Sequence, residues 1–89
     1  MSSDPLLVRA DKASALLMQM QLGQAHVHIR IPFMPFIKPH TYHQVLMTLV
    51  VETQASIKDA RSAYVGGSRS AVSFEMLISM VERELGCNI

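Results

Sequence analysis

The sequence contains a single cysteine, Cys87, which excludes an internal disulfide and favours a reducing compartment. It also lacks a long hydrophobic run. Gln19 and Gln21 interrupt the apolar stretch at 15–20, whereas about 20 apolar residues are needed to span a membrane. No positively charged segment precedes this stretch, so we predict neither a signal peptide nor a membrane partner. The expected location is the cytoplasm.

Sequence signatures of catalysis are also missing. No nucleophile-elbow motif surrounds a serine, and no glycine-rich phosphate loop precedes a predicted helix. Gly66 and Gly67 fit the end of a helix better than a phosphate loop. Glu82 and Glu84 are closely spaced carboxylates, but they would lie on different faces of a helix. We therefore predict a protein that is not an enzyme and that needs no cofactor.

The charge and the apolar content limit the kinds of partner. The formal net charge is +1, which lacks the strong basic bias of a non-specific nucleic-acid binder but leaves a specific one open. Of the 89 residues, 49% are hydrophobic. A chain of this size buries only about 60–65% of its unfolded surface, so the hydrophobic content is higher than a small monomer can bury. We predict one small domain, 1–89, that oligomerises or covers a partner.

Apolar residues recur at helical spacing in three stretches, which predict helices at 5–22, 42–64 and 70–85. Asp4 and Pro5 suit the start of the first helix, and Gly23 suits its end. Thr41 and Gln44 have the spacing of a capping box for the second helix. The expected core positions are Leu6, Ala10, Ala13, Leu17, Met20, Leu46, Leu49, Val50, Thr53, Ile57, Ala60, Tyr64, Phe74, Leu77, Ile78, Val81 and Leu85.

Between the first two helices, polar and apolar residues alternate strictly from His26 to Ile31, and Pro32 ends the run. This period predicts a strand at 25–31 with His26, His28 and Arg30 on its wet face. We find no second strand of equal quality, so the expected partner is the same strand of a second copy. The predicted fold class is α+β, mostly α: an N-terminal helix, one short strand paired across a homodimer, a proline-rich arm and two C-terminal helices.

The motif His26-Val27-His28-Ile29-Arg30-Ile31-Pro32, followed later by Gly67-Ser68-Arg69-Ser70, resembles the ribbon-helix-helix family of DNA-binding repressors. The resemblance covers 26–32 and 66–86, and the segment between them is longer than is usual in the family. It implies that the paired strands enter the major groove of double-stranded DNA, where His26, His28 and Arg30 read base edges. It also implies that the backbone around Ser68, Arg69 and Ser70 holds a phosphate.

A different class of function stays open beside the repressor, namely a protein-binding adaptor, chaperone or inhibitor. Three prolines occur at 32–39 between large apolar residues, which predicts an extended arm carrying Phe33, Met34, Phe36 and Ile37. These side chains either cover the core or dock on another protein. On the last helix, Met76 and Met80 lie opposite the core stripe and suit an adaptable contact surface.

The four histidines form two close pairs, His26 with His28 and His40 with His43. Imidazole nitrogens alone can ligate a transition metal. No acidic residue or cysteine is interleaved with them, and surface histidines are far commoner than ligands. We therefore predict no metal site.

Overall fold

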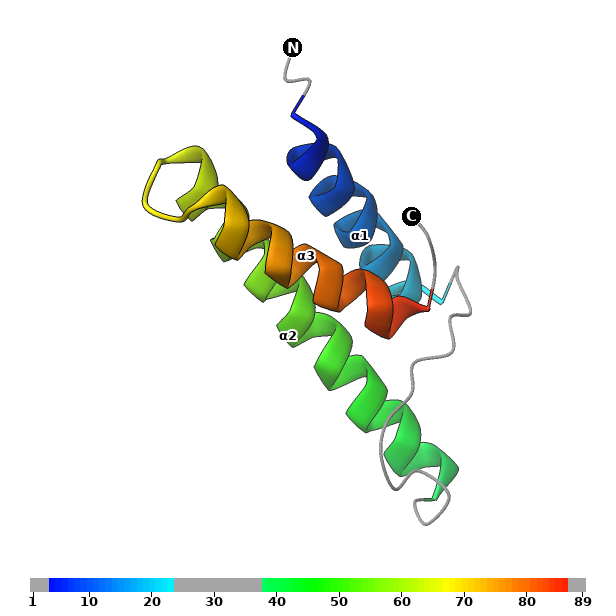
Figure 1. Cartoon of the computed structure of the whole chain (residues 1–89). Coiled ribbons are helices and arrows are strands. Elements are labelled where there is room, and N and C mark those ends of the chain that lie inside the picture. The colour runs from blue at the N-terminus through cyan, green and yellow to red at the C-terminus, as the bar shows by residue number, and fades with distance from the viewer. Residues whose placement is uncertain (1–3, 24–37, 87–89) are drawn as a thin grey trace.

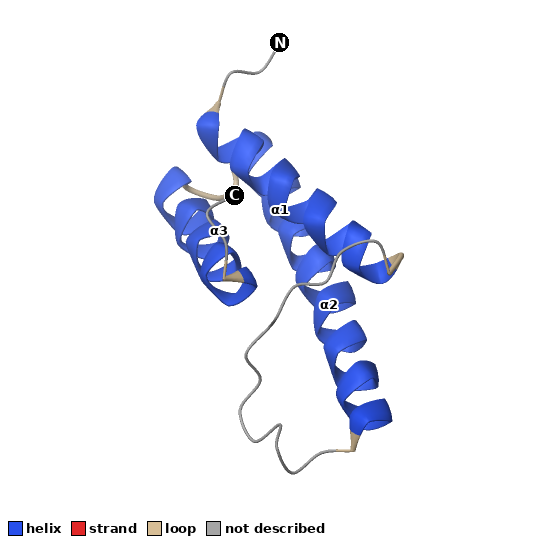
Figure 2. Ribbon diagram, turned by 90° about the vertical axis from the view of Figure 1, so that its right-hand side faces the viewer, coloured by secondary structure: helices blue, strands red, loops and turns tan. Residues whose placement is uncertain are grey.

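The computed structural model describes residues 4–23 and 38–86, which form three helices. Helix α1 spans Pro5–Gln21, α2 spans Pro39–Val65 and α3 spans Ala71–Leu85. Helices α2 and α3 form an antiparallel hairpin, and α1 packs against both of them (Figure 1, Figure 2). The first half of α2 extends beyond the other two helices (Figure 1).

The predicted α+β class is wrong, because residues 4–23 and 38–86 contain three helices and no strand or sheet. The described part of the chain is all-α. The strand predicted at 25–31 lies outside the described residues, and so does most of the proline-rich arm. A short alternating run is weak evidence for a class, because a strand is stable only when other strands satisfy its backbone donors and acceptors. The described residues supply none.

The core lies where the three helices meet, and each helix contributes one stripe to it. Its buried members are Ala10, Ala13, Leu17 and Met20 from α1, Val50, Ile57 and Ala60 from α2, and Phe74, Ile78, Val81 and Leu85 from α3. The members of each stripe are three, four or seven residues apart, spacings that bring side chains to one face of a helix. Ala10 and Ala13 are 0% exposed, so α1 approaches its neighbours over small side chains.

Both ends of α1 and the C-terminal end of α3 are capped as the sequence predicts. The Asp4 carboxylate accepts a hydrogen bond from the Leu6 amide at 2.9 Å. This amide lies in the first turn of α1, where no helix carbonyl is in place to accept its proton. Gly23 follows α1 with φ +71°, and Gly86 ends α3 with φ +65°. Both values lie in the left-handed region, where a residue without Cβ is not strained.

Helix α2 begins earlier than the predicted capping box. Its N-cap residue is Lys38, which makes no side-chain cap, and Pro39 occupies the first turn. Thr41 therefore lies inside the helix, and the prediction that it caps the helix is wrong. The physical reason is that proline has its φ already fixed near the helical value and has no amide proton to leave unsatisfied, so it suits the first helical position.

One polar contact joins the start of α1 to the end of α2. The Tyr64 hydroxyl donates to the Asp4 carboxylate, and the Tyr64 ring stacks on Phe74 of α3 with centroids 4.7 Å apart. The hydroxyl bond, followed by the Leu6 amide, lowers the pKa of Asp4. The same bond, followed by burial, raises the pKa of Tyr64. All three helices thus meet around Tyr64.

The lowered pKa of Asp4 predicts a pH-dependent contribution to stability. A carboxyl whose pKa falls on folding stabilises the fold above its unfolded pKa of about 3.9, and this contribution is lost as the pH drops through the folded pKa. We expect Asp4→Ala to lower the melting temperature at pH 7, and the gap to the unmodified protein to narrow below about pH 4.

Thermal melts by circular dichroism from pH 7 to pH 2 measure this gap. Tyr64→Phe removes only the hydroxyl. When Asp4→Ala is made in the Tyr64→Phe protein, the pH-dependent part of its effect on the melting temperature should therefore be smaller. Asp59→Ala, at an exposed position of α2, is the control and should change little at any pH. A gap for Asp4→Ala that stays constant down to pH 2 would contradict the role of the carboxylate.

Among the described residues, no helix has both the length and the apolar character that crossing a membrane requires.

Candidate functional site

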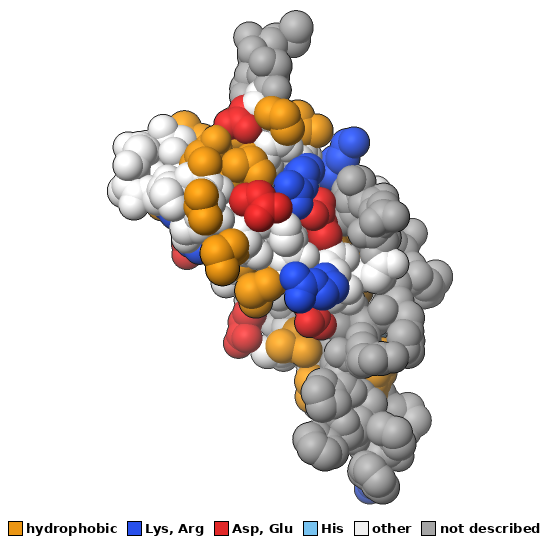
Figure 3. Space-filling model, in the orientation of Figure 1, with side chains coloured by type: hydrophobic (Ala, Val, Ile, Leu, Met, Phe, Trp, Pro, Cys, Tyr) orange, Lys and Arg blue, Asp and Glu red, His pale blue; other side chains and the backbone are white. Residues whose placement is uncertain are grey.

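The outward face of α3 carries three large apolar side chains at four-residue spacing. Val72 is 71% exposed, Met76 61% and Met80 56%. We call these residues the α3 stripe. The spacing of Met76 and Met80 predicted a shared exposed face, and Val72 extends it by one further turn. Figure 3 shows hydrophobic side chains in a band along α3, with acidic and basic side chains beside it.

The α3 stripe is held firmly because the opposite face of α3 is anchored. Phe74 and Ile78 are 0% exposed, and Val81 and Leu85 are buried as well. Ser70 caps the helix by accepting a hydrogen bond from the Ser73 amide at 3.1 Å. A helix fixed in this way holds the backbone of its outer residues in one arrangement, so the backbone loses little entropy when a partner binds.

Two surface hollows flank the α3 stripe. The N-terminal hollow has a volume of about 360 Å³ and is lined by Arg69, Ser70, Val72, Ser73, Met76, Leu77 and Met80. The C-terminal hollow has a volume of about 280 Å³ and is lined by Leu17, Glu52, Thr53, Ser56, Leu77, Met80, Val81, Glu84 and Leu85. Leu77 and Met80 line both, so together they form the ridge between the hollows.

The two hollows carry opposite charges. The charged side chain of the N-terminal hollow is Arg69, whose Nε donates to the Ser73 hydroxyl at 3.1 Å. The charged side chains of the C-terminal hollow are Glu52 and Glu84. Within residues 4–23 and 38–86, neither carboxylate has a hydrogen-bond or ion-pair partner. The linings of the two hollows therefore differ in charge, and the last turn of α3 also carries the exposed Arg83, which lines neither hollow.

The structure places only part of the predicted DNA-binding set. Ser68, Arg69 and Ser70 lie together in the turn before α3, where the Ser68 hydroxyl donates to the Ala63 carbonyl at 3.2 Å. The hydroxyls of Ser68 and Ser70 are thus engaged with the backbone. The predicted base-reading residues His26, His28 and Arg30 lie outside the described residues.

The predicted partner-binding set is divided in the same way. Phe33, Met34, Phe36 and Ile37 of the arm lie outside the described residues, whereas Met76 and Met80 are exposed. The sequence patterns did not predict Val72, Glu52 or Glu84 as members of this surface. Val72 could have been found from its position four residues before Met76. Glu52 could not, because only the packing of α2 against α3 brings it to the hollow.

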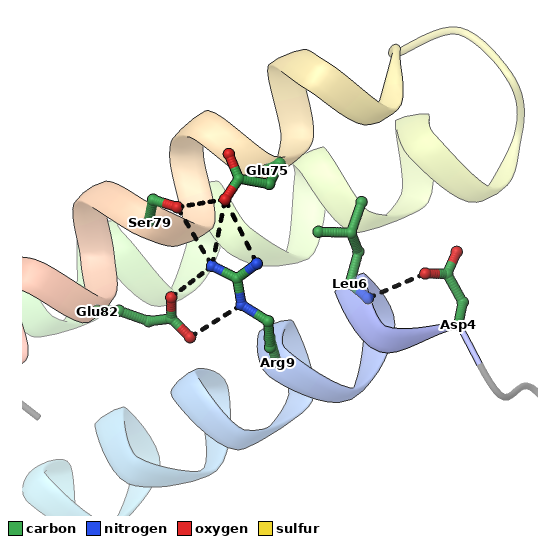
Figure 4. A network of polar contacts seen from close by, with 6 residues as sticks. All are labelled: Asp4, Leu6, Arg9, Glu75, Ser79 and Glu82. Carbon is green, nitrogen blue, oxygen red and sulfur yellow. Dashed lines mark hydrogen bonds and ion pairs between the residues drawn. The ribbon is translucent and has the colours of Figure 1, made fainter. Parts of the chain in front are cut away.

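A second polar cluster ties α1 to α3 beside the α3 stripe (Figure 4). Arg9 Nε donates to a Glu82 carboxylate oxygen at 3.1 Å, and the same guanidinium also reaches Glu75 and the Ser79 hydroxyl. These contacts cross 66 to 73 residues of sequence, so no local pattern announces them.

The pKa shifts in this cluster are those of an ion-pair contact that holds α1 against α3, and they differ from those of an acid–base catalyst. The hydrogen bond with Glu82, followed by the charges of Glu82 and Glu75, raises the pKa of Arg9. The hydrogen bond from Ser79, followed by Arg9, lowers the pKa of Glu75. Both shifts favour the charged forms, whereas a general acid or base at neutral pH needs a pKa near 7. We interpret the cluster as a clip between α1 and α3.

Within the described ranges, no three histidine, cysteine, aspartate or glutamate side chains lie close enough together to hold a metal ion. His40 and His43 belong to α2, and His26 and His28 lie outside the described part of the chain.

No protein-family model, curated protein or solved structure matches the chain. The function is therefore inferred from the geometry of the described residues.

Proposed function

We propose that the protein is a non-enzymatic protein-binding module that acts through the α3 stripe. The observation that carries this proposal is the exposure of Val72, Met76 and Met80 on one face of a capped and anchored helix. Single exposed apolar residues are ordinary, but a contiguous apolar patch with a charged rim is typical of an interaction surface. The two hollows beside the stripe give a partner side chain places to insert.

The free energy expected from burying the α3 stripe is of the size needed for a protein–protein contact. Burying a valine or methionine side chain that was exposed contributes about 1.5–3 kcal/mol, so the α3 stripe can supply several kcal/mol. Much of this gain offsets the lost freedom of the two partners, which leaves an affinity in the micromolar range. Methionine adapts its shape to a partner because it is unbranched and flexible. The shallow hollows, in contrast, are too open to enclose a small molecule.

Site-specific photo-crosslinking tests the proposal. A photoreactive amino acid at Met76, introduced into the cells that express the protein, should form a covalent adduct with a protein chain. The same residue at Asp59, which is exposed on α2, is the control and should form no defined adduct. Adding Met80→Glu should reduce the Met76 adduct about tenfold or more, because it places a charge in the centre of the contact.

The mass of the adduct identifies the partner class. A protein adduct that depends on Met80 supports the proposal, whether the attached chain is a different protein or a second copy. Absence of any adduct at Met76 would contradict it. A gel shift of duplex DNA that weakens steeply with salt and is lost in Arg69→Ala, but not in Met80→Glu, would replace protein binding with DNA binding.

A further inference from the structure

The charges at the two ends of the α3 surface make it complementary to itself. In a contact related by a two-fold axis, the same patch serves on both copies, so each residue i meets residue j while j meets i. Such a patch pairs well only if opposite charges stand at its opposite ends. Arg69 in the N-terminal hollow and Glu84 in the C-terminal hollow meet this condition, whereas Arg83, the exposed basic residue in the last turn of α3, lines neither hollow.

The spacing along α3 fixes a register for this pairing. Met80 and Glu84 are four residues apart in α3, and Arg69, in the turn before the helix, lies beside Ser73 because its Nε donates to the Ser73 hydroxyl at 3.1 Å. An antiparallel alignment that sets Glu84 beside Arg69 of a second copy therefore also sets Met80 beside Ser73 of that copy. Ser73 lines the N-terminal hollow, and Met80 is the exposed side chain of the ridge next to it. The ridge of each copy then meets the hollow of the other.

The side-chain chemistry at the ends of the contact agrees with this register. Arg69 Nε donates to the Ser73 hydroxyl, and no contact with residues 4–23 or 38–86 occupies its two terminal nitrogens, which can donate to a carboxylate. Glu84 has no partner within residues 4–23 and 38–86. A guanidinium and a carboxylate form strong charge-assisted hydrogen bonds of defined geometry. Two such pairs, one at each end, would enclose the apolar centre around Met76.

We infer that the α3 stripe binds the same stripe of a second copy, with the two α3 helices antiparallel and Glu84 of each copy on Arg69 of the other. This inference rests on the proposed function, because it names the partner of the same surface. It differs from the dimer expected from the sequence, which depended on paired strands.

Charge reversal with rescue tests the inference. At about 100 µM the unmodified protein should scatter light with twice the chain mass of 9.9 kDa. Arg69→Glu and Glu84→Arg should each weaken dimerisation about tenfold or more, because each sets like charges against one another at both ends. The double variant, Arg69→Glu with Glu84→Arg, restores opposite charges and should recover most of the affinity.

Matched controls separate the contact from a general effect of charge. Lys12→Glu and Asp59→Arg make the same kinds of reversal at exposed positions of α1 and α2, outside both hollows, and should leave the dimer affinity unchanged. Circular dichroism spectra that match the unmodified protein show that each variant is folded. The comparison is then between folded proteins that differ only in the placement of charge.

Each outcome has one consequence. Loss of the dimer in both single variants with recovery in the double variant supports the inference. A monomer at every concentration, or a double variant as weak as the single ones, overturns it. A monomer that still crosslinks through Met76 to a different protein overturns the self-pairing while the proposed function stands. A monomer with no adduct at Met76 contradicts both.

Discussion

Phe74→Ala should lower the free energy of unfolding by about 3–5 kcal/mol. The ring is 0% exposed, and it stacks on Tyr64 with an interplanar angle of 22°. Removing it deletes its own buried apolar surface and leaves a cavity that the neighbouring helices fill only in part. A domain of this size has a total stability of about 5–13 kcal/mol, so the substitution removes a large share of it.

Urea unfolding followed by circular dichroism measures this loss. Val51→Ala is the control, because it trims an apolar side chain of α2 that is 53% exposed and should change the stability by about 0.5 kcal/mol or less. Equal losses from the two substitutions would show that α3 is not anchored through Phe74. The firm presentation of the α3 stripe would then lose its basis.

The helices were predictable because their signals are local and repeated. Each predicted stripe of core residues recurs every three or four positions over about three or more turns, and only a helix brings such positions together. The ends at Asp4, Gly23 and Gly86 were predictable because each uses the chemistry of its own side chain or of a missing Cβ. The three helices and these ends are confirmed, whereas Leu49, an expected core position, is 38% exposed.

The start of α2 was mispredicted because two local signals compete there. The capping-box spacing of Thr41 and Gln44 and the proline at 39 both mark a helix start, and they differ by a few residues. The helix starts at the proline. Because it has already begun at Pro39, Thr41 lies inside its first turn and is not at the N-cap position. A threonine inside a helix then costs little, because propensities differ by only about 0.7 kcal/mol.

The fold class was mispredicted because the prediction depended on one short segment. The alternating run from His26 to Ile31 predicted the strand, and that run lies outside the described residues. Helical periodicity extends over far more of the chain and determines the class of the described part. A strand requires a partner for its backbone, and that requirement cannot be read from the segment itself.

The candidate site was predictable only where a single helix forms it. The shared face of Met76 and Met80 follows from their spacing of four residues. The C-terminal hollow also needs Leu17 from α1 and Glu52 from α2, and their positions depend on how three helices pack. The Arg9 clip is non-local in the same sense, because its partners lie 66 to 73 residues away. Packing therefore adds Glu52 to the C-terminal hollow, whereas Arg69 and Glu84, on which the self-pairing depends, belong to α3 and the turn before it.

Ala13→Glu should destabilise the protein by about 4 kcal/mol or more, which is enough to unfold much of it. Ala13 is 0% exposed and belongs to the seam between α1 and the other two helices. A glutamate there needs more room than the core offers, and its charge would be buried without a partner. Moving α1 away would relieve both problems, but it would expose Leu17 and pull Arg9 from Glu82.

Ala15→Glu provides the matched control, since it makes the same substitution two residues along the same helix at an exposed position. Alanine and glutamate differ little in helix propensity, so this variant should stay within about 0.5 kcal/mol of the unmodified protein. Thermal melts of the two variants at the same pH measure the difference. If Ala13→Glu were as stable as Ala15→Glu, α1 would not be part of the core, and the clip and the C-terminal hollow that depend on α1 would have to be abandoned with it.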